Sequence, residues 1–140
     1  MEPRHFTIED LPMEQLVPDL FKRAALRTDD AMITFNWFEP GFPRQEMHHH
    51  PFDQFALLVS GRLTMAFEDR LIELCAGEAV YIPADVPHTG FPSSEEVAFN
   101  IDIFAPPRQD YLYFTANQDD WGDVAADAPR GTPFRIGGGS

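Results

Sequence analysis

Short apolar segments separated by turn residues are the feature that most constrains how this chain can fold. The segments are rich in β-branched and aromatic residues, and glycine, proline or acidic residues stand between them. They comprise residues 31–38, 54–60, 62–67, 71–74, 80–82 and 97–104. Helical periodicity is almost absent, so the sequence predicts an all-β domain, a jelly-roll barrel of the double-stranded β-helix type.

The pairing of two segments is also predicted from the turn between them. Residues 54–60 and 62–67 are separated by Gly61 alone, which is typical of a hairpin. Residues 21–26 fit a helix or a strand, and the pattern leaves both open.

The ends of the chain differ in composition from its middle. The N-terminal residues are polar and proline-rich, and the C-terminal residues are rich in proline, glycine and aspartate. We therefore expect residues 1–30 to form an arm and the first strands, with a short strand or turn near residues 5–8, and residues 31–112 to form the barrel. Residues 113–136 should form a tail over the barrel or a partner subunit, with at most one helical turn near residues 119–124. Residues 137–140 are expected to be an appended linker.

Residues 97–104 alternate between an apolar face and a mixed face. The mixed face carries Asn100, Asp102 and Phe104. A carboxylate loses its hydration when it is buried, so Asp102 is expected to face a wet cavity. Asn100 on the same face is a candidate substrate-binding residue.

Residues 54–60 have one polar or small face, with Gln54, Ala56, Leu58 and Ser60, and one apolar face, with Phe55, Leu57 and Val59. Both faces of such a strand must be covered. A homodimer is the simplest way to cover the outer face.

Histidines alternate just before this strand, at His48 and His50. If residues 44–50 are extended, both imidazoles point to one side and His49 points to the other. Gln54 can then add an amide oxygen, and His88 can complete the set from a neighbouring strand. Three imidazoles and one amide suit one divalent transition metal per chain, zinc, nickel, iron or manganese.

The same extended conformation would place Arg44 and Glu46 on the side of the histidines. Both are then candidates for substrate binding at the rim of the site. The alternative is that Arg44 and Glu46 pair with each other at the surface.

Charge and cysteine content limit the partners and the compartment. A formal net charge of −13 argues against nucleic acid and anionic membranes as partners. No apolar run approaches the ~18–20 residues of a membrane span, and the N-terminus does not resemble a signal peptide. The single Cys75 excludes an internal disulfide, is expected to be a buried small hydrophobic residue, and fits a cytoplasmic protein.

Two spaced motifs resemble those of the cupin superfamily. The first runs from Gly41 through His48, His50 and Gln54 to Gly61, and the second runs from Gly77 through Pro83 to His88. The chain departs from the family pattern by one extra residue after Gly41, by Gln54 for glutamate, by Asp85 for glycine and by Pro92 for asparagine. The resemblance implies the same metal ligands, His48, His50, Gln54 and His88, inside a cupin barrel.

A narrower resemblance is carried by the sequence from Asp102 to Leu112. Following a His-x-His-Pro-x-x-Gln motif, it resembles the KdgF-type pectin-degradation cupins. These are small dimeric metalloproteins that help convert 4,5-unsaturated uronates into linear keto forms. The resemblance implies that Asp102 moves a proton, Phe104 packs against the sugar and Arg108 binds its carboxylate.

Other readings of these residues remain open at the level of sequence. A neutral ligand set leaves the full metal charge to polarise a substrate oxygen, which favours Lewis-acid chemistry. The alternatives are a cupin dioxygenase or lyase acting on another small acid or diketone, and a non-catalytic cupin that binds a small molecule. Asp102 and Arg108 could also have purely structural roles.

Overall fold

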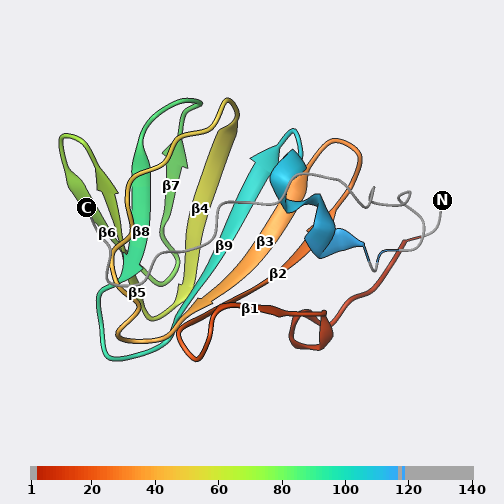
Figure 1. The fold of residues 1–140 in the computed structure, drawn as a ribbon, viewed down its shortest axis with the longest axis horizontal. Helices are drawn as coiled ribbons and strands as arrows, with labels where there is room; N and C mark the ends of the chain where they lie inside the picture. Colours follow the sequence, from red (N-terminus) through yellow and green to blue (C-terminus); the bar gives the residue numbers. More distant parts are fainter. Residues whose placement is uncertain (1–2, 117, 119–140) are drawn as a thin grey trace.

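The computed structural model describes residues 3–116 and 118, and this part of the chain forms nine strands and two short 3-10 helices (Figure 1). The strands are β1 Glu14–Val17, β2 Phe21–Arg27, β3 Met32–Phe38, β4 Asp53–Ser60, β5 Arg62–Phe67, β6 Leu71–Cys75, β7 Ala79–Ile82, β8 His88–Pro92 and β9 Ala98–Ala105. The 3-10 helices are η1 Ile8–Asp10 and η2 Gln109–Thr115.

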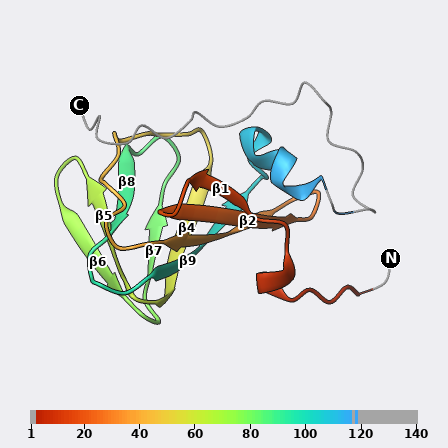
Figure 2. The ribbon, with the colours of Figure 1, turned by 60° about the horizontal axis from the view of Figure 1, so that its bottom comes forward.

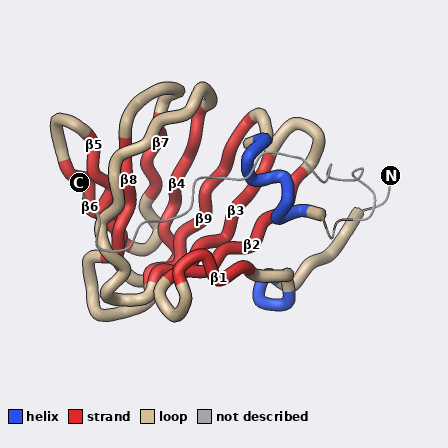
Figure 3. The backbone as a smooth tube through the Cα atoms, in the orientation of Figure 1, coloured by secondary structure: helices blue, strands red, loops and turns tan. Residues whose placement is uncertain are grey.

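The strands form two antiparallel sheets. The larger sheet has the order β1-β2-β3-β9-β4-β7 and the smaller has the order β6-β5-β8 (Figure 3). The first and last strands of the barrel, β3 and β9, are neighbours, as in a jelly roll in which sequence order and spatial order differ. The predicted all-β jelly-roll fold is confirmed.

An apolar core fills one end of the space between the sheets. Phe21, Phe38 and Phe42 pack together there, with ring centroids 4.6–5.3 Å apart. Leu58 of the larger sheet and Leu63 of the smaller sheet join the same cluster.

The N-terminal arm covers part of the outer face of the larger sheet. Leu11 of the arm packs with Ala24 and Phe35, and Trp37 stacks on Phe99 at 4.8 Å. Figure 2 shows η1 on one side of this sheet and η2 on the other. The arm therefore stabilises the outer surface, and η2 approaches the inner one.

The predicted hairpin between residues 54–60 and 62–67 is wrong. β4 pairs with β7 and β9, whereas β5 pairs with β6 and β8. Gly61 turns the chain from one sheet into the other at a φ of 77°, and a Cβ there would overlap the Val97 carbonyl oxygen. Strand signals on either side of a glycine do not specify whether the strands share a sheet.

The predicted strand at residues 44–50 is also wrong. Only His48 pairs there, through an isolated antiparallel bridge to His88. Pro43 and Pro51 on either side cannot donate main-chain hydrogen bonds, which shortens any ladder.

The ends of the chain can also be compared with the predictions. A short strand or turn was expected near residues 5–8, and the 3-10 turn η1 begins at Ile8; β1 lies within residues 1–30, where the arm and first strands were expected. The ambiguous residues 21–26 form β2, and η2 lies where a loop was expected. The helical turn predicted near residues 119–124 lies outside the described residues. Cys75 is exposed at the end of β6, so the prediction of a buried cysteine is wrong.

Candidate active site

Three of the four predicted metal ligands form a tight cluster. Ring nitrogens of His48, His50 and His88 lie within 4.8 Å of one another. His50 and His88 are buried, whereas His48 is exposed. The main-chain bridge between His48 and His88, with two hydrogen bonds of 2.9 Å, holds two of the three ligands in register.

The His88 ring presents a lone pair to the cluster. Its Nδ1 donates to the Val86 carbonyl oxygen at 2.8 Å, which leaves Nε2 as the unprotonated nitrogen of the neutral ring. Nε2 is buried, and none of the residues that the structure describes gives it a hydrogen-bond partner. A buried acceptor without a donor is costly, and a metal ion would satisfy it.

His50 shows the same arrangement with a second acceptor facing it. Its Nδ1 donates to the Phe52 carbonyl oxygen at 3.0 Å, so Nε2 carries a lone pair. This Nε2 lies 3.0 Å from Oε1 of Gln54, an atom that also only accepts. Two facing acceptors repel each other unless a cation lies beside both, so the donor set of this chain fits a metal.

The surroundings of the three cluster histidines lower their pKa values and favour the neutral rings. Loss of hydration lowers the pKa of His50, and it lowers the pKa of His88 to about 4. Loss of hydration where protein atoms surround the His48 ring lowers its pKa, and the nearby His88 lowers it further. All three imidazoles therefore offer lone pairs at neutral pH, as metal ligands must.

Asp102 lies beside this cluster on the inner face of β9. Loss of hydration raises the pKa of its carboxyl, and a hydrogen bond from Asn100 opposes the rise. Oδ1 accepts from Asn100 at 3.1 Å and Oδ2 accepts from Asn36 at 3.2 Å. A hydrogen bond from Gln54 also reaches Asp102, which links the acid to a metal-ligand candidate. A carboxyl with a raised pKa is a better proton acceptor than an ordinary aspartate, which suits a group that takes up and returns a proton.

The predicted rim residue Asn100 is a buried part of this network. Its Oδ1 accepts from Asn36 at 3.0 Å, and its Nδ2 also donates to the Leu57 carbonyl oxygen at 3.3 Å. Asn36, which sequence reasoning missed, lies opposite Asn100 across β3 and β9. These amides hold the Asp102 carboxyl in one orientation.

Arg108 is buried in an aromatic setting. Its guanidinium lies 3.7 Å from the Tyr111 ring centroid and 5.1 Å from that of Phe104. Asp110, also missed from the sequence, accepts from Nε at 3.0 Å and from Nη2 at 2.7 Å. One side of the Arg108 fork is therefore already occupied.

Phe104 connects the two parts of the site. It is fully buried, and its ring lies edge-on to His50 at 5.9 Å and to Tyr111 at 6.0 Å. The rim predictions fare differently: Glu46 is exposed, and Arg44 is exposed over the Phe91 ring at 5.6 Å. His49, expected to point away from the metal, is exposed with Nδ1 3.7 Å from Asp85 Oδ1.

Residues 37–104 match the family described as the cupin domain. The chain has the cupin fold. One relative of this chain is the pectin degradation protein KdgF of Dickeya dadantii (strain 3937), 28% identical over 109 residues, which cover 78% of this chain and 98% of the relative. The predicted resemblance to the cupins and to KdgF is confirmed.

Solved structures share the architecture of this chain. KdgF from Halomonas sp. matches with a TM-score of 0.68 and 24% identity over 79% of this chain and 100% of that chain. An RmlC-like cupin from Shewanella frigidimarina NCIMB 400 matches with a TM-score of 0.66 and 25% identity over 78% and 96%. Among the described residues, no helix is long and apolar enough to cross a membrane.

Proposed function

We propose that this protein is a metal-dependent enzyme that opens and ketonises 4,5-unsaturated uronates. The observation that carries the proposal is the convergence of ring nitrogens of His48, His50 and His88, within 4.8 Å of one another, beside the desolvated carboxyl of Asp102. The similarity to the pectin degradation protein KdgF supports a uronate as the substrate. His48, His50, Gln54 and His88 would hold one divalent transition metal.

The residues around the metal site then have distinct tasks. A bound metal supplies Lewis-acid polarisation of a substrate oxygen. Arg108 helps to bind the substrate carboxylate with the N–H groups that Asp110 leaves available. Phe104 packs against the sugar and excludes water from the site.

Asp102 is the proton carrier in this proposal. It takes the proton of the C1 hydroxyl as the bond between C1 and the ring oxygen breaks, which leaves an aldehyde at C1 and an enolate at C5. It then returns that proton to C4, so that the enolate becomes a ketone and the reaction is a net isomerisation. The hydrogen bonds from Asn36 and Asn100 orient the carboxyl for both transfers.

The test is to incubate metal-loaded protein with unsaturated galacturonate and to follow the absorbance of the conjugated double bond. We expect the absorbance to fall faster than in buffer, without oxygen uptake. No acceleration with bound metal confirmed by elemental analysis would refute the assignment. Turnover that consumes oxygen would indicate a cupin dioxygenase instead.

We further propose that the enzyme is a homodimer. Phe55, Val59 and Tyr81 on the outer face of β4 and β7 are 49%, 48% and 49% exposed, and the Phe55 and Tyr81 rings contact each other at 5.3 Å. Phe55→Asp should produce monomers in analytical ultracentrifugation. Leu71→Asp, at an exposed leucine of the other sheet, is the matched control. A wild-type protein that sediments as a monomer at micromolar concentration contradicts the proposal.

A further inference from the structure

A second buried arginine faces the inside of the barrel and has no place in the proposed mechanism. Arg23 of β2 is 7% exposed, and its guanidinium lies 4.5 Å from the Tyr111 ring centroid and 5.0 Å from that of Phe21. Its Nε donates to Oδ1 of Asn36. A buried guanidinium is costly without partners, so the groups around it indicate its purpose.

The strand register places Arg23 on the same side of the sheet as Asp102. Arg23 lies opposite Asn36 across β2 and β3, and Asn36 lies opposite Asn100 across β3 and β9. Asn36 in turn donates to the Asp102 carboxyl at 3.2 Å. The positive charge of Arg23 is near enough to lower the pKa of His48 and to oppose the rise in the pKa of Asp102. Arg23 therefore belongs to the chamber that holds the metal cluster and the acid.

Arg23 and Arg108 differ in how far their nitrogens are already engaged. The carboxylate of Asp110 takes Nε and Nη2 of Arg108, which largely neutralises that cation. Within residues 3–116 and 118, no carboxylate pairs with Arg23, and no residue accepts a hydrogen bond from its Nη1 or Nη2. Nη1 and Nη2 of Arg23 are therefore available together, and this pair of donors matches the two oxygens of a planar carboxylate.

The Tyr111 ring brings the two arginines together. Both guanidinium groups lie within 4.5 Å of its centroid. Two cations on one ring repel each other, and an anion that reaches both would relieve that repulsion.

We propose that Arg23 is a substrate-binding residue whose Nη1 and Nη2 bind the carboxylate of a sugar acid, with Arg108 as the weaker second contact. The inference deepens the proposed function and rests on it for the choice of a uronate. Asn36 and Tyr111 position the Arg23 guanidinium, and they do not themselves contact the carboxylate.

The kinetic test compares metal-loaded wild type, Arg23→Lys and Arg23→Met on unsaturated galacturonate and on its neutral methyl ester. A charge-assisted hydrogen bond contributes about 1.5–3 kcal/mol, so Arg23→Met should raise the KM for the acid about 10- to 100-fold. The KM for the methyl ester should change little, and kcat should change less than about threefold because Asp102 and the metal ligands are untouched. Arg23→Lys keeps the charge but not the fork, and it should lie between the two.

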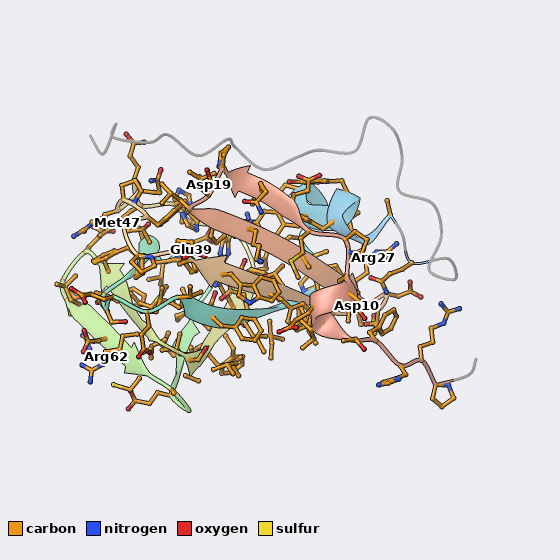
Figure 4. The ribbon with its side chains drawn as sticks, turned by 90° about the horizontal axis from the view of Figure 1, so that it is seen from below. Asp10, Asp19, Arg27, Glu39, Met47 and Arg62 are labelled. Carbon is orange, nitrogen blue, oxygen red and sulfur yellow. The ribbon has the colours of Figure 1, made fainter. Side chains whose placement is uncertain are left out.

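The matched control is Arg27→Met, on the same face of the same strand. Arg27 donates to Thr115 at 2.9 Å, and in Figure 4 it lies well apart from Met47, the neighbour of His48. Its KM values should stay at the wild-type level. An unchanged KM in Arg23→Met, or an equal rise for the acid and the ester, would overturn the inference.

A binding experiment separates this inference from the proposed function. Calorimetric titration of metal-loaded protein with D-galacturonate, a saturated sugar acid, needs no turnover. If the wild type does not convert the unsaturated uronate but Arg23→Lys and Arg23→Met weaken D-galacturonate binding, the proposed function fails and the role of Arg23 stands. If the wild type does not bind D-galacturonate, the role of Arg23 fails.

Discussion

The inner face of the larger sheet is divided into an apolar half and a polar half, often within one strand. Along β2 the inward residue changes from Phe21 to Arg23, and along β3 it changes from Phe38 to Asn36. β9 changes in the same way, from Ala98 to Asn100. Residues two apart in a strand are neighbours on the same face of the sheet. Each strand therefore changes from the apolar core to the polar half between one inward-facing residue and the next.

The two halves contribute opposite terms to stability. The apolar half gains free energy from burial of Phe21, Phe38, Leu58 and their neighbours. The polar half buries Arg23 and the amides, and it is tolerable only because most of these groups are hydrogen-bonded. Stability and chemistry are therefore encoded at different positions of the same strands, and substitutions can separate them.

The largest effect is expected from His88→Ala. Removal of a group that hydrogen-bonds to a metal ligand typically lowers metal affinity about 10- to 100-fold. Removal of the ligand itself should therefore lower the affinity by more than about 100-fold and abolish activity. Metal content after dialysis and turnover of unsaturated galacturonate measure this. His49→Ala, at an exposed neighbour of the ligands, should retain both.

Asp102→Asn should reduce kcat by about 10²- to 10⁴-fold, the usual contribution of a proton-transferring side chain. The folded pKa of Asp102 is raised, so its stabilising contribution is present at low pH and is lost as the pH rises through the folded pKa. At pH 7 the substitution removes this cost but also removes one acceptor from the Asn36 and Asn100 hydrogen bonds, so the urea midpoint should change little while activity falls. A variant with full activity would remove Asp102 from the mechanism.

Leu58→Ala tests the apolar half. Leu58 is 2% exposed, and truncation of a fully buried leucine costs about 2–5 kcal/mol of the free energy of unfolding. The metal affinity of the remaining folded protein should match the wild type, because the ligands lie in the other half. Chemical denaturation and metal titration are the paired measurements, and a large loss of metal affinity would show that the halves are coupled.

The smallest effect concerns pH. The pKa of His88 falls to about 4 in the folded protein, whereas an unfolded histidine binds its proton near 6.5. The unfolded state therefore binds more protons between these values, and the stability of metal-free protein should decrease as the pH falls from about 6.5 towards 4. Urea midpoints of Asp102→Asn protein, which lacks the opposing carboxyl, measure this decrease. A midpoint that rises over this range would contradict the assignment of neutral buried imidazoles.

Local spacing was sufficient to predict that the histidines converge. His48, His50 and His88 lie together as the pattern implied, although the strand expected around His48 reduces to one bridge. They converge because the bridge sets the geometry of His48 and His88 without a longer ladder. Asp110 could also have been found locally, since an acid two residues after Arg108 can close onto its guanidinium.

The remainder of the chamber depends on contacts between distant parts of the chain. Arg23 and Asn36 acquire their meaning only through the register of β2, β3 and β9, which brings them beside Asn100. β2 also carries Lys22 and Arg27, and no short-range pattern in the sequence marks Arg23 among these cations as inward-facing and close to Asn36. The placement of β4 and β5 in different sheets likewise depends on long-range pairing at β7, β8 and β9.

The paired main-chain hydrogen bonds between His48 and His88 tie a loop to a strand at the point where both supply a ligand. These backbone contacts do not involve an ion, in contrast to zinc fingers, whose folding depends on their metal. Removal of the metal by a chelator should therefore leave a folded apoprotein that can bind a different ion. The rate of metal exchange should depend on access to the inside of the barrel and should not require unfolding.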